Sequence, residues 1–254
     1  IIFDVRRASE SLRPRDVKQM AGRAGRAHGQ VGEANVHIVL TNDDAYTWKK
    51  KFEEDSSYEV RSTLNNIETF AFHVISQVVR ENITDKESFE YWYDRTLDKF
   101  QRIERKEPIP VYEDIAKELH ETGSAEFNEE TGEIKPRPLG RICAAFYFSP
   151  YDVRDWFNNI TVLFKKDLLY NDVCQAWALS NVTSAKEWDS EALKKHTEDL
   201  FEQVASYGLT AKSGISARFL AVNSILNGKY PRIEVPCYYS VKNDLPRVLT
   251  AIES

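Results

Sequence analysis

Residues 19–26, with the sequence QMAGRAGR, hold the side chains best suited to chemistry on phosphate groups. On a helix, Gln19, Arg23 and Arg26 are spaced i, i+4 and i+7, which places all three on one face. Arginine offers paired donors to phosphate oxygens and does not lose its charge. Two guanidinium groups and one amide on a single face therefore suit a triphosphate.

Two glycines interrupt this segment, although glycine is unfavourable inside a helix. Inside a helix, Gly22 and Gly25 would each cost about 1 kcal/mol relative to alanine. Close approach of another backbone or of a nucleotide is the natural reason. The alternative is an ordinary basic surface helix that binds no ligand.

The elements expected to position this segment form a short strand, helix and strand. Ile1–Asp4 is typical of the end of a buried strand, Asp16–Ala27 of a helix, and Val36–Leu40 of a second strand. This order predicts the closing portion of an α/β layer over residues 1–45. Because the chain begins inside an apolar run and without Met, we expect it to be a piece of a longer protein.

Residues 46–136 show helical periodicity followed by a hairpin signal. Apolar residues recur at spacings of three and four between Ile67 and Val79, and a second helix is expected after a capping box of Thr84 and Glu87. A third helix is expected over Tyr112–Thr122.

The hairpin signal is a turn over residues 128–132, flanked by Ala125–Phe127 and Glu133–Lys135. Helices followed by a small hairpin predict a winged helix.

Residues 137–254 are expected to form a helical bundle, because apolar clusters follow one another at short intervals. These clusters are Ile142–Phe148, Val153–Phe164, Leu168–Leu179, Leu193–Tyr207 and Ile215–Leu226. The sequence as a whole therefore predicts a mainly α protein with a partial α/β segment.

Composition and charge narrow the class of protein. The 254 residues are 42% apolar, and no run is long enough to cross a membrane. Three widely spaced cysteines, Cys143, Cys174 and Cys237, fit a reduced intracellular protein and no metal site. The net charge of −6 conceals a window from Arg6 to Arg26 with seven basic and two acidic residues, a net +5 that leaves −11 elsewhere.

The string QMAGRAGR resembles motif VI of superfamily 2 helicases, and in particular that of the Ski-like group. The resemblance implies a helix at the ATP cleft of a second RecA-like domain. It implies that Arg23 and Arg26 act as arginine fingers on the β- and γ-phosphates. Gln19 is then implied at the γ-phosphate and attacking water, with Gly22 beside the nucleotide.

A second segment, Pro138–Ser149, is similar to the stretch with LGRI that leads from the winged helix into the helical bundle of this family. The segment departs from the family by Arg137-Pro138 before Leu139 and by Cys-Ala-Ala where Ala-Ser is common. Most of its residues are expected to pack in the core. The resemblance covers nearly the whole chain.

The resemblance implies an ATP-dependent helicase that moves 3′–5′ on a single strand. The phosphate loop G-x-x-x-x-G-K-[ST] and an acidic Mg²⁺ box are absent from this sequence, so we expect ATP and Mg²⁺ to be bound mainly outside it, and the isolated chain to be inactive. The alternative is a non-catalytic binding or interaction module derived from a helicase. Within this family the exosome-associated RNA helicases carry an inserted arch, for which the link between the second and third helices is too short here. The resemblance therefore leans toward DNA-repair-type or spliceosome-type relatives, with DNA favoured over RNA.

Two parts of the chain are candidates for nucleic-acid contact. The expected wing carries Glu126, Glu129, Glu130 and Glu133 against Lys135, which favours a structural hinge over a DNA-binding wing. The segment 240–252 resembles the start of the family's ratchet helix, with Asp244 as its cap and Pro246 in its first turn.

On that helix Arg247 is the best candidate for touching the strand; the alternative is a solvated helix residue. Trp156, Trp177 and Trp188 are candidates for base stacking, although Trp177 lies in an apolar row and is expected in the core. We expect no membrane partner, and we expect an intracellular location in cytoplasm or nucleus, with a viral origin allowed.

Overall fold

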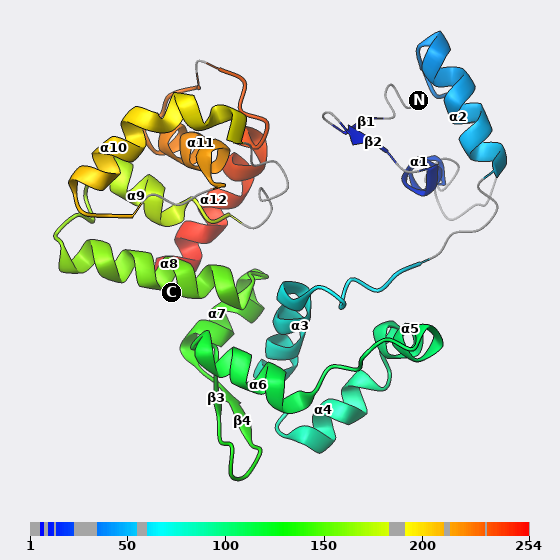
Figure 1. Ribbon diagram of the computed structural model, residues 1–254, viewed down its shortest axis with the longest axis horizontal. Helices are drawn as coiled ribbons and strands as arrows, with labels where there is room; N and C mark the ends of the chain where they lie inside the picture. The colour runs from blue at the N-terminus through cyan, green and yellow to red at the C-terminus, as the bar shows by residue number, and fades with distance from the viewer. Residues whose placement is uncertain are drawn as a thin grey trace. The chain divides into compact units, whose positions relative to one another are not determined.

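The computed structural model describes residues 6–7, 10–12, 14–22, 35–54, 60–182, 191–210, 214–231 and 233–253. The chain divides into two compact units, Ile1–Val60 and Arg61–Ser254. Over the described residues the protein is mainly helical, and its strands belong to two separate two-stranded sheets (Figure 1). The predicted predominance of helix is therefore confirmed.

In its described residues the first unit contains two short strands and two helices. Strands β1 (Arg6–Arg7) and β2 (Glu10–Ser11) pair antiparallel, and helices α1 (Pro14–Ala21) and α2 (Asn42–Glu54) follow. Val17 of α1 and Trp48 of α2 are buried together, and Leu12, Ile38, Leu40 and Phe52 pack against them. This small cluster holds α1 against α2.

Two predictions for this unit are corrected. The helix expected over Asp16–Ala27 begins at Pro14 and ends at Ala21, and the residues after Gly22 lie outside the described part. The strand expected over Val36–Leu40 is an irregular segment in which only Ile38 forms an isolated bridge. The strand expected at Ile1–Asp4 lies outside the described residues, and α2 crosses the boundary expected at residue 45.

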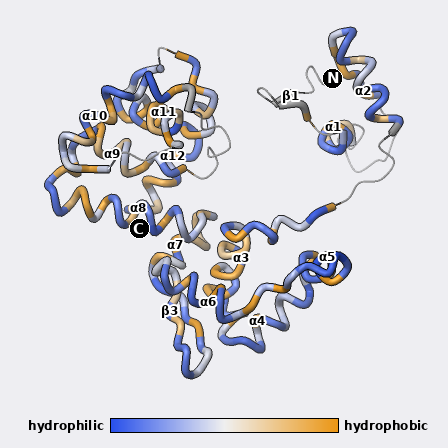
Figure 2. Tube along the Cα trace, viewed as in Figure 1, coloured by the Kyte–Doolittle hydropathy of each residue, from blue (hydrophilic) through white to orange (hydrophobic). Residues whose placement is uncertain are grey.

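The second unit begins with four helices. They are α3 (Ile67–Val79), α4 (Lys86–Tyr93), α5 (Leu97–Arg105) and α6 (Tyr112–Glu121). The apolar stripe predicted for α3 is confirmed in its middle part, since Phe70, Ala71, Val74, Ile75 and Val78 are all buried. At its two ends Ile67 is exposed and Val79 is partly buried. In Figure 2 the orange segments of α3 and α6 mark the apolar residues of these two helices.

The helix start predicted at Thr84 is wrong by one residue. Asp85 caps α4 by accepting a hydrogen bond from the Ser88 backbone N–H, while the Ser88 hydroxyl accepts one from the Asp85 backbone N–H at 3.0 Å. Asp85 and Ser88 thus form the capping box expected of Thr84 and Glu87. The single helix expected after it is two helices, because Thr96 caps α5.

The predicted hairpin is confirmed. Strands β3 (Ala125–Phe127) and β4 (Ile134–Pro136) pair antiparallel, with Phe127 opposite Ile134. Gly132, in the turn, has a φ of 74°, a region that favours glycine. The Ile134 N–H donates to the Thr84 carbonyl at 2.8 Å, which ties the hairpin to the segment before α4.

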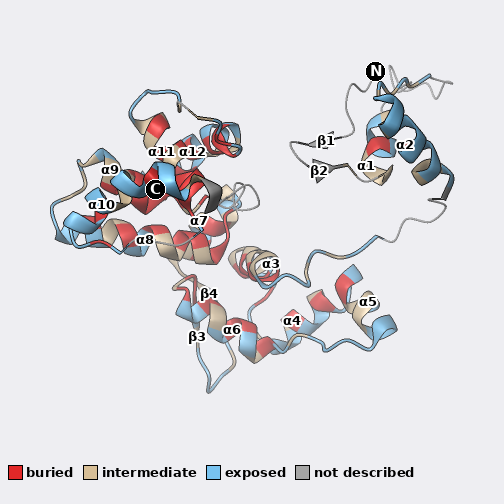
Figure 3. Cartoon of the chain, turned by 45° about the horizontal axis from the view of Figure 1, so that its top comes forward, coloured by how far each residue is buried: buried red, intermediate tan, exposed pale blue. Residues whose placement is uncertain are grey.

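The rest of the second unit is helical. Its elements are α7 (Pro138–Phe146), α8 (Pro150–Lys165), α9 (Asp172–Leu179), the 3-10 helix η3 (Glu191–Thr197), α10 (Glu198–Ser206), α11 (Ser216–Leu226) and α12 (Tyr238–Glu253). Helix α11 packs against α9, η3 and α12, and α7 packs against α3 and α8. One continuous hydrophobic core runs from Phe70 to Ala251 (buried segments red in Figure 3).

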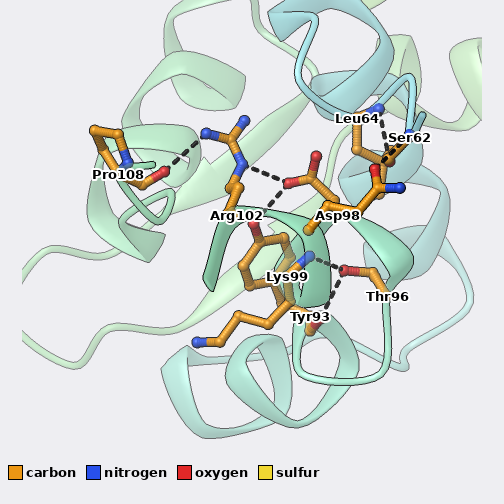
Figure 4. A network of polar contacts seen from close by, with 9 residues as sticks. Ser62, Leu64, Tyr93, Thr96, Asp98, Lys99, Arg102 and Pro108 are labelled. Carbon is orange, nitrogen blue, oxygen red and sulfur yellow. Dashed lines mark hydrogen bonds and ion pairs between the residues drawn. The ribbon is translucent and has the colours of Figure 1, made fainter. Parts of the chain in front are cut away.

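A buried polar network holds α4, α5 and the loop before α6 together. The carboxylate of Asp98 accepts hydrogen bonds from the Tyr93 hydroxyl and from Nε of Arg102, each at 2.7 Å (Figure 4). A second nitrogen of Arg102 donates to the Pro108 carbonyl at 2.7 Å. Because the carboxylate and guanidinium are both paired and hydrogen-bonded, their burial is tolerated.

Candidate nucleic-acid interface

The residues expected to bind phosphate are only partly described. Gln19 is exposed on α1, and Gly22 follows the last helical residue, its N–H donating to the Lys18 carbonyl at 2.8 Å. The helical cost expected at Gly22 therefore does not apply, because Gly22 lies beyond the helix end. Arg23 and Arg26 lie outside the described residues, so their place on a shared face stays a prediction.

Helix α12 presents one buried and one exposed side. Tyr238, Val241, Leu245, Val248 and Ala251 are buried in the core. The opposite side is exposed over two to three turns, and we call it the α12 face; its residues are Tyr239, Lys242, Asn243, Pro246, Arg247 and Thr250. Spacing of three and four brings these side chains onto one surface.

The start predicted for this helix is corrected. Helix α12 begins at Tyr238, so Asp244 does not cap it and Pro246 lies inside it. Proline in a helix interior removes one backbone hydrogen bond. Pro246 is exposed, so water can reach the carbonyl that loses its partner, and the buried residues on both sides of it hold the helix together.

Arg247 is exposed but engaged by two partners within the protein. Its guanidinium forms an ion pair with Asp244 at 3.0 Å and lies 4.6 Å from the centroid of the Phe148 ring. Phe148 is buried and meets Trp156 edge-on at 4.8 Å. The cation predicted to touch a strand is thus held at the edge of the core, where a phosphate has to compete with Asp244.

Tyr239 adds an aromatic group to the α12 face. It is 63% exposed, and its hydroxyl lies 3.0 Å from that of Tyr230. This hydrogen bond is the main cause of a raised pKa at Tyr230. The sequence did not predict this pair, because the contact between the loop that follows α11 and the first turn of α12 depends on the tertiary fold.

The base-stacking role predicted for the tryptophans is corrected for Trp156 and Trp177, the two that the structure describes. Trp156 and Trp177 are buried, and their indole N–H groups donate to the carbonyls of Asn181 and Thr210, each at 2.9 Å. Both rings are part of the core and unavailable to bases; for Trp177 this was the expectation. Trp188 lies outside the described residues.

The LGRI segment packs as expected. A Cβ added to Gly140 would lie 2.2 Å from the Ser124 carbonyl oxygen and 2.9 Å from a methyl of Ile75. Only glycine lets α7 approach α3 and the start of the hairpin this closely. The buried thiol of Cys143, one turn on, has a pKa raised to about 12 because burial disfavours the thiolate.

The hairpin carries the acidic residues expected of it. Glu126, Glu129, Glu130 and Glu133 are all exposed. Two of them are paired, Glu129 with Lys117 at 3.6 Å and Glu133 with Lys135 at 2.9 Å. The hairpin surface repels phosphates, so the α12 face is the better candidate for nucleic acid.

Among the described residues, no cluster of His, Cys, Asp or Glu could hold a metal ion. Within the same part of the chain, no helix is long and apolar enough to cross a membrane. No family model and no curated protein matches the sequence.

Proposed function

We propose that this chain is the C-terminal part of an ATP-dependent helicase resembling the Ski-like group of superfamily 2, and that its helical bundle guides a single strand. The observation that carries the proposal is an order of features along the chain. QMAGRAGR is followed by helices and a hairpin, then by LGRI at the start of α7, and last by a long helix with an exposed polar and aromatic face.

The proposal divides the chain into three domains. The first boundary moves from residue 45 to the end of the first compact unit, because α2 crosses residue 45. Residues 1–60 are then the end of a RecA-like domain, residues 61–136 a winged helix and residues 137–254 a ratchet bundle. The succession of α3, α4, α5, α6 and the β3–β4 hairpin supports the winged helix. The acidic hairpin supports its role as a hinge that does not grip DNA.

The α12 face supports strand binding through its mixture of groups. Proteins that hold single strands combine cations along the backbone with rings on which bases stack. Lys242 and Arg247 supply the cations, and Tyr239 supplies a ring. The surrounding chain is acidic overall, so we expect weak binding that falls steeply with salt.

The nucleotide part of the proposal rests on the resemblance. ATP hydrolysis would supply the free energy for movement along the strand, and Mg²⁺ would neutralise charge on the phosphates. Arg23 and Arg26 would contribute positive charge at the phosphates, and such fingers are worth about 10³ to 10⁵ in rate. Gln19, exposed at the end of α1, would orient the attacking water.

Fluorescence anisotropy with labelled DNA tests the strand-binding part. We expect the 254-residue chain to bind single-stranded DNA more tightly than duplex DNA, with RNA weaker than DNA. Lys242→Ala should weaken single-strand binding, whereas Lys49→Ala, which removes the same charge from exposed α2, should leave it unchanged. Equal effects of the two variants, or no single-strand binding at all, would contradict the proposal.

ATPase assays separate the helicase from the non-catalytic alternative. In the longest native form of the protein, Arg23→Ala and Arg26→Ala should each abolish turnover and leave the circular dichroism spectrum unchanged. Strand-stimulated ATP hydrolysis would exclude the non-catalytic module. Its absence in a well-folded protein would favour that module.

A further inference from the structure

A cavity of about 420 Å³ lies next to Tyr230, whose ring contacts Tyr238 in the first turn of α12. Residues from α9, η3, α11 and the loop that follows α11 line it. Leu220 and Ile233 give it an apolar part, while Asn223, Asn227, Lys229 and His196 give it a polar one. Such a mixture of one apolar surface and a few polar groups is typical of small-ligand sites.

Tyr230 also lines this cavity and is held in place before any ligand arrives. Its ring is 64% exposed, yet its centroid lies 4.7 Å from that of the nearly buried Tyr238 ring, and its hydroxyl is hydrogen-bonded to Tyr239. An exposed ring with this support has lost its rotational freedom in advance, so a ligand that stacks on it loses little further entropy.

Asn223 and Asn227 offer a donor and an acceptor together. The Asn227 Nδ2 group donates to the Asn223 carbonyl at 2.8 Å and lies 3.2 Å from Asn223 Oδ1. In the described part of the chain, no group forms a hydrogen bond with Asn227 Oδ1 or with Asn223 Nδ2. One acceptor and one donor match the alternating pattern on the edge of a nucleobase.

We propose that this cavity binds one nucleobase of a single strand, with Tyr230 as the stacking surface, Asn223 and Asn227 on the base edge, and Lys229 beside the phosphate. The inference rests on the proposed function, which places a single strand on the α12 face. The 3.0 Å contact between Tyr230 and Tyr239 makes the cavity continuous with that face. A strand lying on that face therefore has a base within reach of the cavity.

The test compares two labelled strands of about 12 nucleotides, one of thymidines and one in which every base is missing. Both carry the same phosphate charge, so only the first can fill the cavity with a base. Tyr230→Ala should weaken anisotropy-measured binding of the thymidine strand about tenfold, the size expected for one lost stack, and leave the abasic strand unchanged. Tyr230→Phe keeps the ring and its contact with Tyr238 but loses the hydrogen bond to Tyr239, so its affinity for the thymidine strand should lie between those of the wild type and Tyr230→Ala.

Tyr170→Ala is the matched control, because Tyr170 is 93% exposed and lies outside the cavity. Asn227→Ala should also weaken only the strand with bases. If wild type binds strands but Tyr230→Ala and Tyr170→Ala behave alike, the cavity proposal is overturned while strand binding stands. If wild type binds neither strand, the proposed function fails together with it.

Discussion

The guanidinium of Arg247 lies over the ring of Phe148, 99 positions earlier in the chain, at 4.6 Å from the ring centroid. Phe148 ends the turn between α7 and α8, and Arg247 lies in the second half of α12. The contact therefore ties the last helix to the start of the bundle. The same contact limits how much of the positive charge of Arg247 a bound single strand can reach.

Arg247 and Asp244 should have opposite effects on strand affinity. Asp244 competes with phosphate for the guanidinium at 3.0 Å, so Asp244→Ala should tighten binding of single-stranded DNA several-fold. Arg247→Ala should weaken binding and lower the slope of log affinity against log salt by about 1, because one phosphate contact is lost. Anisotropy titrations at several salt concentrations measure both, and unchanged affinity in Arg247→Ala would remove Arg247 from the interface.

The same substitution has a separate effect on stability. An exposed cation–π contact contributes about 0.5–1 kcal/mol and an exposed ion pair less, so Arg247→Ala should lower the free energy of unfolding by about 1 kcal/mol. Arg247→Lys should lose less, because it keeps a positive charge. Urea unfolding followed by tryptophan fluorescence measures the difference.

Gly140→Ala should destabilise the second unit by about 2 kcal/mol, because the new methyl group would overlap the Ser124 carbonyl and the Ile75 side chain. Arg141→Ala, at the exposed neighbouring position on α7, should change the free energy of unfolding by less than about 0.5 kcal/mol. Denaturant titration compares the two, and equal stability would show that α7 moves away from the hairpin at no cost.

The buried network around Asp98 should be the most sensitive polar site. Asp98→Ala leaves the Arg102 charge and the Tyr93 hydroxyl without their carboxylate, which should cost about 3–5 kcal/mol. Tyr93→Phe removes one hydrogen bond and should cost about 1 kcal/mol. Thermal unfolding ranks the variants, and a Tyr93→Phe variant as damaged as Asp98→Ala would contradict this ordering.

The sequence predicted the elements whose signals are local. The apolar stripe of α3, the helix α6 and the β3–β4 hairpin each depend on spacing or turn residues within about a dozen positions. The clusters predicted for the bundle likewise coincide with α7 to α11. These features could be read in advance because periodicity and turn chemistry operate over short distances.

Contacts between distant segments were not predictable from spacing. The sequence predicts Pro246 in the first turn of the last helix, because nothing nearby shows that this helix already begins at Tyr238 and packs on α11. Trp156 could have been placed in the core, since it shares its helix side with Val153 and Leu163. The pairing of Arg247 with Phe148 and of Tyr239 with Tyr230 depends on the tertiary fold.

Alkaline pH should destabilise the protein through three tyrosines whose pKa is raised in the folded state. Burial raises the pKa of Tyr93, and hydrogen bonding to Asp98 raises it further; burial also raises the pKa of Tyr112 and Tyr151. In the unfolded chain a tyrosine loses its proton near pH 10, whereas in the folded protein these three keep it. Above about pH 10 the folded state therefore binds more protons, and stability falls as pH rises.

The measurement is the midpoint of urea unfolding between pH 8 and pH 11. The midpoint should be steady up to about pH 9.5 and then decline, and Tyr93→Phe should make the decline shallower because one of the three groups no longer titrates. Tyr170→Phe, at an exposed position, should leave the slope unchanged. A decline equally steep in Tyr93→Phe and wild type would show that Tyr93 does not contribute to it, and would place the alkaline sensitivity on Tyr112, Tyr151 or the lysines.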